Sequence, residues 1–297
     1  MKNLLKLATG AMIIISYLFL LLSATLSVQY LSAGFLISNF NKGSTYTYIE
    51  KALKIAAGDA IRNQAASQGV DFEKLTTGER AEIEKIIDNL TEPLNRENIR
   101  DFTEKNIVNF ENFLNIPGYD LVVYVPISKL KINEQVYANL PDYLKSDSVN
   151  INNLYTEGVV NGSMGNLLKL NGMGRYIKLA AAFLLTLLVV SFLLNLKLQG
   201  GLINFDRSAS YLMLSGFLTL SLAWLLKVIS NTAGEGLELK KNSTEILVGS
   251  VVPVLFTETI KLWVVVGSTL ILSSYFFSYA FKNYYNNKLK STKNRLS

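Results

Sequence analysis

Acidic side chains come nearest to a catalytic pattern in this chain. They gather on one stretch, at Glu79, Glu82, Glu84, Asp88, Glu97, Asp101 and Glu104. Two carboxyl groups on opposite sides of a glycosidic bond can cleave it, one as acid and the other as base or nucleophile. Here, however, the acids alternate with lysines and arginines at helical spacing, which is typical of a solvated helix surface with i to i+4 ion pairs. We therefore expect no catalytic pair.

Two other reactive residue types are missing. The chain of 297 residues has no cysteine and no histidine. This removes disulfides, Cys nucleophiles, His general bases and the usual zinc and haem ligands. No loop has EF-hand spacing, and no G-x-S-x-G or phosphate-binding glycine motif occurs. We expect a protein that is not an enzyme, with no catalytic residue, no cofactor and no metal site.

Long apolar runs dominate the rest of the chain, although 49% hydrophobic residues is an ordinary composition. Four uncharged stretches reach or approach the roughly 20 residues that cross a bilayer core. They are Leu7–Asn39, Leu179–Leu196, Ser208–Leu226 and Leu262–Phe281. The sequence therefore predicts a mainly α membrane protein with four transmembrane helices and a mostly helical domain between the first two.

The first run resembles a signal peptide at its start, because Lys2 and Lys6 precede it and Ser23–Thr25 resembles a weak cleavage site. A signal's apolar region covers about 7–15 residues, whereas this uncharged run covers 33. We favour a retained anchor helix, and cleavage is the alternative.

Charge predicts the orientation in the membrane. Residues 39–175 carry 15 Lys/Arg against 18 Asp/Glu, a net charge of −3, and the rest of the chain is net positive. The short segments elsewhere are basic: Lys2 and Lys6 lie at the N-terminus, Lys197 and Arg207 in the link between the second and third spans, and five basic residues with no acid in the tail. By the positive-inside rule these three segments, and with them both termini, are cytoplasmic, so 39–175 lie outside the inner (plasma) membrane. The overall charge of +6 therefore reflects topology, and we expect no nucleic-acid partner.

The predicted organisation follows from these spans. It assigns 1–38 to the cytoplasmic end and first span, 39–175 to the extracytoplasmic domain, 176–197 to the second span, 198–207 to a cytoplasmic loop, 208–229 to the third span, 230–259 to an outer loop, 260–282 to the fourth span and 283–297 to a basic cytoplasmic tail. The outer loop holds an apolar stretch around Pro253 that is too short to span. We predict an interfacial helix there, or a segment packed under the domain, on Ile246, Val251, Val252, Leu255 and Phe256.

Three helices are predicted in the first part of the extracytoplasmic domain. Two begin at capping boxes, Thr47 with Glu50 and Thr76 with Glu79, and the third carries an apolar stripe ending at Phe113.

A short β segment follows the third helix. It lies in "LVVYVPIS" after a Pro-Gly turn, and its proline indicates an edge strand. The candidate partner-binding residues are Phe113, Tyr119, Tyr124 and Pro126. "NGMG", at residues 171–174, is predicted to be a flexible hinge before the second span.

The segment Asn95–Leu130 resembles one found in uncharacterised bacterial four-helix membrane proteins. The matching positions are Phe113, Leu114, Asn115, Leu121, Val123, Val125, Ile127 and Leu130. Phe113 stands where that group usually has tyrosine, and "IPG" stands where it has one glycine. The resemblance implies four spans with the domain between the first and second, and the group has no assigned activity to carry over.

These patterns predict a non-enzymatic multi-pass membrane protein that presents an extracytoplasmic domain for partner binding or envelope organisation. Its expected partners are the lipid bilayer and an envelope protein or a second copy. One alternative is a mechanotransmission subunit like the FtsX-type permeases, whose "REIGI"-like motif is missing here. Another is a subunit of an oligomeric channel, although no charged residue lies near the middle of a predicted span.

Overall fold

The computed structural model describes residues 1–67, 69–72, 74–125, 127–129, 138, 141–159, 162–237 and 242–296. The chain divides into two compact units. Unit 1 comprises Met1–Tyr30, Arg175–Ser230 and Phe256–Ser297, and unit 2 comprises Leu31–Gly174 and Asn231–Leu255.

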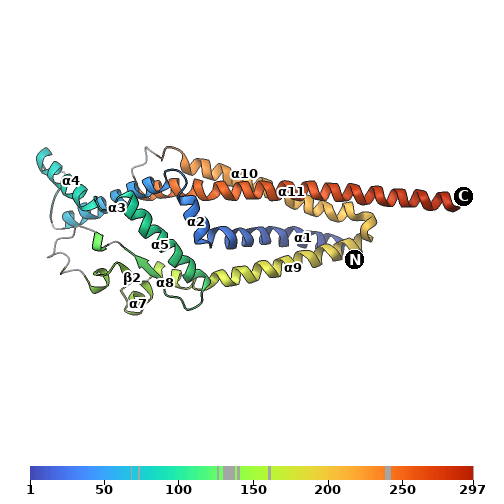
Figure 1. Ribbon diagram of the computed structural model, residues 1–297, viewed down its shortest axis with the longest axis horizontal. Helices are drawn as coiled ribbons and strands as arrows, with labels where there is room; N and C mark the ends of the chain where they lie inside the picture. The colour runs from blue at the N-terminus through green and yellow to red at the C-terminus, as the bar shows by residue number, and fades with distance from the viewer. Residues whose placement is uncertain are drawn as a thin grey trace. The chain divides into compact units, whose positions relative to one another are not determined.

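Unit 1 is built from long helices (Figure 1). They are α1 (Lys2–Thr25) with a π-helical turn η1 (Leu26–Tyr30), α9 (Met173–Gln199), the short η4 (Gly201–Asn204), α10 (Phe205–Gly234) and most of α11 (Ser243–Leu296). Among the described residues, four segments are long and apolar enough to cross a membrane: Lys2–Tyr30, Met173–Gln199, Phe205–Gly234 and Ser243–Asn287. The predicted mainly α fold with four such helices is confirmed, and it is compatible with a multi-pass membrane protein.

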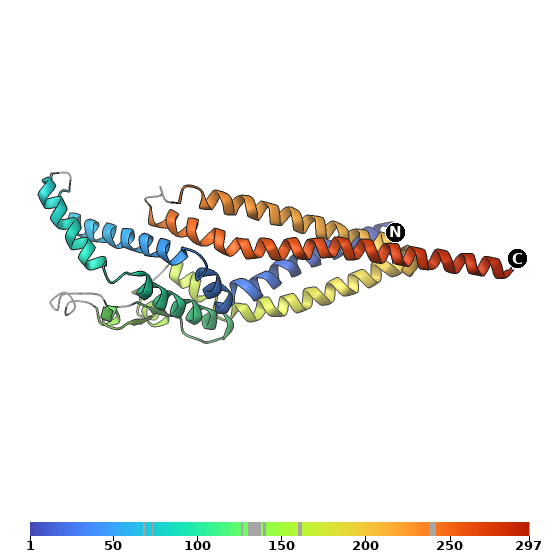
Figure 2. The ribbon, with the colours of Figure 1, turned by 45° about the horizontal axis from the view of Figure 1, so that its top comes forward.

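Hydroxyl and amide side chains join the helices of unit 1. The Asn195 amide of α9 donates to Thr9 Oγ1 of α1 at 2.8 Å, and Trp263 of α11 donates to Thr25 Oγ1 of α1 at 2.9 Å. The helices α10 and α11 lie side by side (Figure 2) and meet at Gly216 and Gly267. A Cβ built on Gly216 would lie 2.8 Å from the Gly267 carbonyl oxygen. Small residues allow this close approach of the two backbones.

The first apolar run divides into two helices, where we predicted one span ending at residue 38. Its second part is α2 (Ala33–Phe40), which begins at the Ser32 N-cap and belongs to unit 2. A single helix over the whole run would measure about 50 Å at 1.5 Å per residue. The bilayer core is only about 30 Å thick, so the run exceeds what one span needs.

The predicted outer loop with a separate interfacial helix also differs from the structure. The helix α11 runs without a break from Ser243 through Pro253 and onward. Its first turns belong to unit 2, where Leu247 packs against the buried side chains of Tyr46, Ile49 and Ile99. These contacts hold the segment in the domain and favour the packed alternative.

Three longer helices follow α2 in unit 2: α3 (Thr45–Ser67), α4 (Thr77–Thr91) and α5 (Arg96–Asn115). The capping box of α4 is confirmed, because Glu79 N donates to Thr76 Oγ1 and Thr76 N donates to a Glu79 carboxylate oxygen. The predicted box at Thr47 is wrong, since α3 already begins at Thr45.

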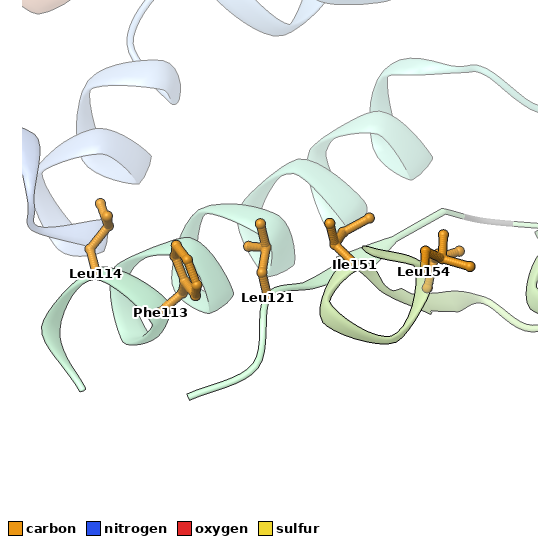
Figure 3. Close-up of a cluster of buried hydrophobic side chains, with 6 residues drawn as sticks. Phe113, Leu114, Leu121, Ile151 and Leu154 are labelled. Carbon is orange, nitrogen blue, oxygen red and sulfur yellow. The ribbon is translucent and has the colours of Figure 1, made fainter. Parts of the chain in front are cut away.

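The remaining elements of unit 2 are short. They are β1 (Val122–Tyr124), η2 (Ile127–Lys129), η3 (Asp142–Leu144), β2 (Ser148–Asn150), α7 (Ile151–Thr156) and α8 (Ser163–Leu168). The strands pair antiparallel with Val123 opposite Val149. A buried core holds these elements against α5, formed by Phe113, Leu114, Leu121, Val149, Ile151 and Leu154 (Figure 3).

Asparagine side chains tie the irregular part of unit 2 together. Asn171 accepts a hydrogen bond from Gly118 N at 2.7 Å and donates to the Tyr119 carbonyl at 2.8 Å. A Cβ on Gly174 would lie 2.5 Å from Asn115 Oδ1. The predicted flexible hinge at 171–174 is therefore a close-packed, hydrogen-bonded joint, because its glycines permit tight contact.

Candidate binding groove

A groove with a volume of ≈ 410 Å³ lies beside α5 in unit 2. Ligand sites commonly have volumes of about 300–1,000 Å³. Its lining residues are Ile37, Asp101, Glu104, Lys105, Val108, Asn109, Asn112, Tyr119 and Tyr124. The α5 residues recur at intervals of three and four, so that one face of this helix forms a wall.

Two predicted partner-binding residues, Tyr119 and Tyr124, lie in this groove. Both side chains are half-buried, and a tyrosine of this kind presents an apolar ring and a polar hydroxyl to a ligand. The turn at Gly118, with φ +78°, leads into this segment.

The other two predicted contact residues do not lie in the groove. Phe113 is 0% exposed and belongs to the core of unit 2 (Figure 3). We therefore correct its assignment: the apolar stripe of α5 turns this ring inward, and no partner can reach it in this structure. Pro126 lies outside the described residues.

Asparagines of α5 cover one edge of β1, and sequence reasoning missed them. Asn106 accepts from Tyr124 N at 2.7 Å and donates to the Tyr124 carbonyl at 2.9 Å. Asn109 donates to the Val122 carbonyl. The opposite edge pairs with β2. Strand addition by a partner needs free backbone groups at an edge, so β1 offers side chains to a partner and not its backbone.

A hydrogen-bonded cluster forms one end of the groove. One Glu104 carboxylate oxygen accepts from Arg100 Nε at 2.9 Å, Asn41 Nδ2 at 3.1 Å and the Tyr46 hydroxyl at 3.3 Å. Partial burial acts to raise the pKa of Glu104, but these bonds and the Arg100 charge outweigh it, so the pKa lies below its ordinary value. Burial and the neighbouring carboxylate raise the pKa of Tyr46.

This arrangement suits binding better than acid–base chemistry. Lys105 pairs with Asp101 at 3.0 Å. A general acid at neutral pH needs a carboxyl group with a raised pKa, whereas that of Glu104 is lowered. The groove therefore offers amides, tyrosines and a paired charge, which can hold a ligand by hydrogen bonds and apolar contact.

Two of the other candidate acids, Glu84 and Glu79, form an ion pair and a helix cap. Arg62 binds Glu84 at 2.8 Å and Asp59 at 3.0 Å, and Glu79 caps its own helix. Across the described ranges, His, Cys, Asp and Glu form no group of three or more that could hold a metal ion.

The five residues predicted for an interfacial segment all lie on α11. Ile246 is 0% exposed, and Val251, Val252, Leu255 and Phe256 are half-buried.

Comparisons with known protein families, curated proteins and solved structures found no match. The resemblance to bacterial four-helix membrane proteins therefore stays a prediction.

Proposed function

We propose that this chain is a non-enzymatic multi-pass protein of the plasma membrane that binds a protein partner through the groove of unit 2. The observation that carries the proposal is that Tyr119 and Tyr124 line one groove together with polar side chains of α5. Tyrosine is enriched at protein interfaces, where its ring excludes water and its hydroxyl forms a hydrogen bond.

The charge distribution supports an extracytoplasmic position for unit 2. Its main segment is net negative, whereas the basic residues concentrate in the segments at the other ends of the apolar helices. The positive-inside rule assigns the short basic segments to the cytoplasm, and unit 2 then lies outside. A partner in the cell envelope, or a second copy of the chain, then has access to the groove.

The choice of a binding protein over an enzyme rests on the side chains. The chain has no histidine and no cysteine, and the two carboxylates of the groove are held in an ion pair and a hydrogen-bonded cluster. Both features support binding as the role of the groove.

Photocrosslinking in intact membranes tests the proposal. A photoreactive amino acid replaces Tyr119, Tyr124 or Asn112 in the groove, and Tyr155 serves as the control because its ring is 46% exposed on α7. We expect the groove positions to give one adduct of the same mass and Tyr155 to give none. The proposal is wrong if the groove positions give no adduct, or if Tyr155 gives the same one.

A further inference from the structure

A second recess, with a volume of ≈ 180 Å³, lies in unit 1 between the start of α10 and the later turns of α11. It is lined by Leu202, Asn204, Phe205, Asp206, Ser278, Phe281, Lys282 and Asn286. Ser278, Lys282 and Asn286 recur every fourth residue, so they share one face of α11. The recess is therefore lined by polar side chains of α11 and by the rings of Phe205 and Phe281.

The Asp206 carboxylate and the Lys282 ammonium both line this recess, but they do not form an ion pair with each other. Neither Asp206 nor Lys282 has an ion-pair partner in the part of the chain that the structure describes. An acid in the first turn of α10 stabilises that helix end, and a lysine beyond an apolar stretch extends toward water. Those roles explain each residue separately, but not two unpaired opposite charges in one small recess.

The recess lies at the ends of two segments that can cross a membrane, because Phe205 begins one and Asn286 is next to the last residue of the other. The Phe205 ring centroid lies 4.9 Å from that of Phe281 and 5.9 Å from that of Phe192. These rings join α9, α10 and α11 at the ends of three segments that can cross a membrane. Tyrosine is enriched at the interface of a bilayer, and Tyr284 and Tyr285 of α11 directly precede Asn286 of the recess. We therefore expect the recess to contact headgroup and glycerol atoms.

We propose that this recess binds the headgroup of a zwitterionic phospholipid that carries a primary ammonium. Lys282, with Ser278 and Asn286 as hydrogen-bond donors, meets the phosphate, and Asp206 accepts from the ammonium. A purely anionic headgroup would be repelled by Asp206, and a quaternary ammonium has no N–H to donate. The proposal requires the apolar helices to cross a bilayer but does not depend on the groove of unit 2, so the two can fail separately.

Native mass spectrometry of the detergent-purified full chain tests this lipid preference. The protein is titrated with phosphatidylethanolamine, phosphatidylcholine and phosphatidylglycerol of identical acyl chains. We expect phosphatidylethanolamine to bind most tightly, roughly tenfold or more over phosphatidylcholine, which is the lower end of what one hydrogen bond to a charged group contributes. Equal binding of the three lipids overturns the proposal, and so does equally tight binding of soluble phosphoethanolamine, which would identify a free metabolite as the ligand.

Three variants assign the contacts. Asp206→Asn should abolish the preference for phosphatidylethanolamine over phosphatidylcholine. Lys282→Gln should weaken the binding of both lipids. The control Lys227→Gln also removes one positive charge, but about 30 Å away along α10, at 1.5 Å per residue. It should change neither the lipid preference nor the strength of lipid binding. The thermal unfolding midpoint of each variant shows that it is folded. Loss of phosphatidylglycerol binding in Lys282→Gln, with an unchanged lipid preference in Asp206→Asn, would indicate a simple cation–phosphate contact and contradict the proposal.

Discussion

The side-chain amide of Asn106 forms two hydrogen bonds with the Tyr124 backbone: it accepts from the N–H and donates to the carbonyl. We predict that Asn106→Leu destabilises unit 2, by about 1–3 kcal/mol for each buried backbone group left without a partner. The control Asn153→Leu changes an exposed asparagine of α7 and should stay within about 0.5 kcal/mol. Chemical denaturation of the purified protein measures both free energies of unfolding, and equal losses would contradict this role of Asn106.

Glu104 should make the stability of unit 2 sensitive to acid. Its folded-state pKa lies below the ordinary value of 4.5, so its ionised form stabilises the fold above that pH. This contribution is lost as the pH falls below 4.5 and through the folded-state pKa. We predict that Glu104→Gln flattens the pH dependence of the unfolding midpoint between about pH 3 and about pH 6. Parallel pH profiles of the two proteins would contradict the prediction.

Tyr46 gives the corresponding effect in alkali. Its pKa is raised above the ordinary 10.0, so the protonated hydroxyl stabilises the fold below about pH 10, and this contribution is lost as the pH rises toward the folded-state pKa. Tyr46→Phe keeps the ring in the core and removes the titrating group. We expect its unfolding midpoint to fall less than that of the native chain at high pH, and an identical alkaline fall would contradict this.

At the scale of elements, paired glycines decide how closely α10 and α11 pack. A Cβ on Gly216 would lie 2.7 Å from an Ile271 side-chain carbon, whereas a Cβ on Gly78 of α4 meets nothing within 4 Å. Gly216→Ala should therefore cost about 1–3 kcal/mol through overpacking. Gly78→Ala should be neutral or stabilising by up to about 1 kcal/mol. Thermal unfolding in detergent compares the two, and similar shifts would contradict this account of the contact.

The sequence predicts those elements that are determined by residues close together in the chain. The apolar helices and the Thr76 cap follow from neighbouring residues, and the structure has both. The continuity of α11 through Pro253 depends on tertiary contacts such as that of Leu247. Sequence periodicity carries no information on such contacts.

The groove was predictable only in part for the same reason. The β segment after the Pro-Gly turn is the predicted partner-binding surface, and two of its four candidate residues, Tyr119 and Tyr124, do line the groove. The asparagines that hydrogen-bond to the β1 edge belong to α5, and they precede their partners by 18 and 13 residues in the chain. Nothing in their spacing indicates that they face a strand. Phe113 ends the apolar stripe of α5, and this periodicity already indicates the core in which the ring lies, so its assignment as a contact residue conflicts with its own helix pattern.

At the scale of the whole molecule, the proposed function depends on which side of the membrane unit 2 lies. Lysines and arginines concentrate in the N-terminal segment, in the short link between the second and third spans and in the tail, which indicates that these segments are cytoplasmic and that unit 2 lies outside. The chain contains no cysteine, so that a single introduced thiol reports its own position without background.

Thiol labelling in intact cells tests this placement most directly. Ser67→Cys introduces a thiol at an exposed position at the end of α3, and Asn287→Cys introduces one at the far end of the α11 span. We predict that a membrane-impermeant maleimide labels the first variant in intact cells and the second only after permeabilisation. Labelling of Asn287→Cys in intact cells, or protection of Ser67→Cys, would contradict the proposed display of unit 2 outside the membrane.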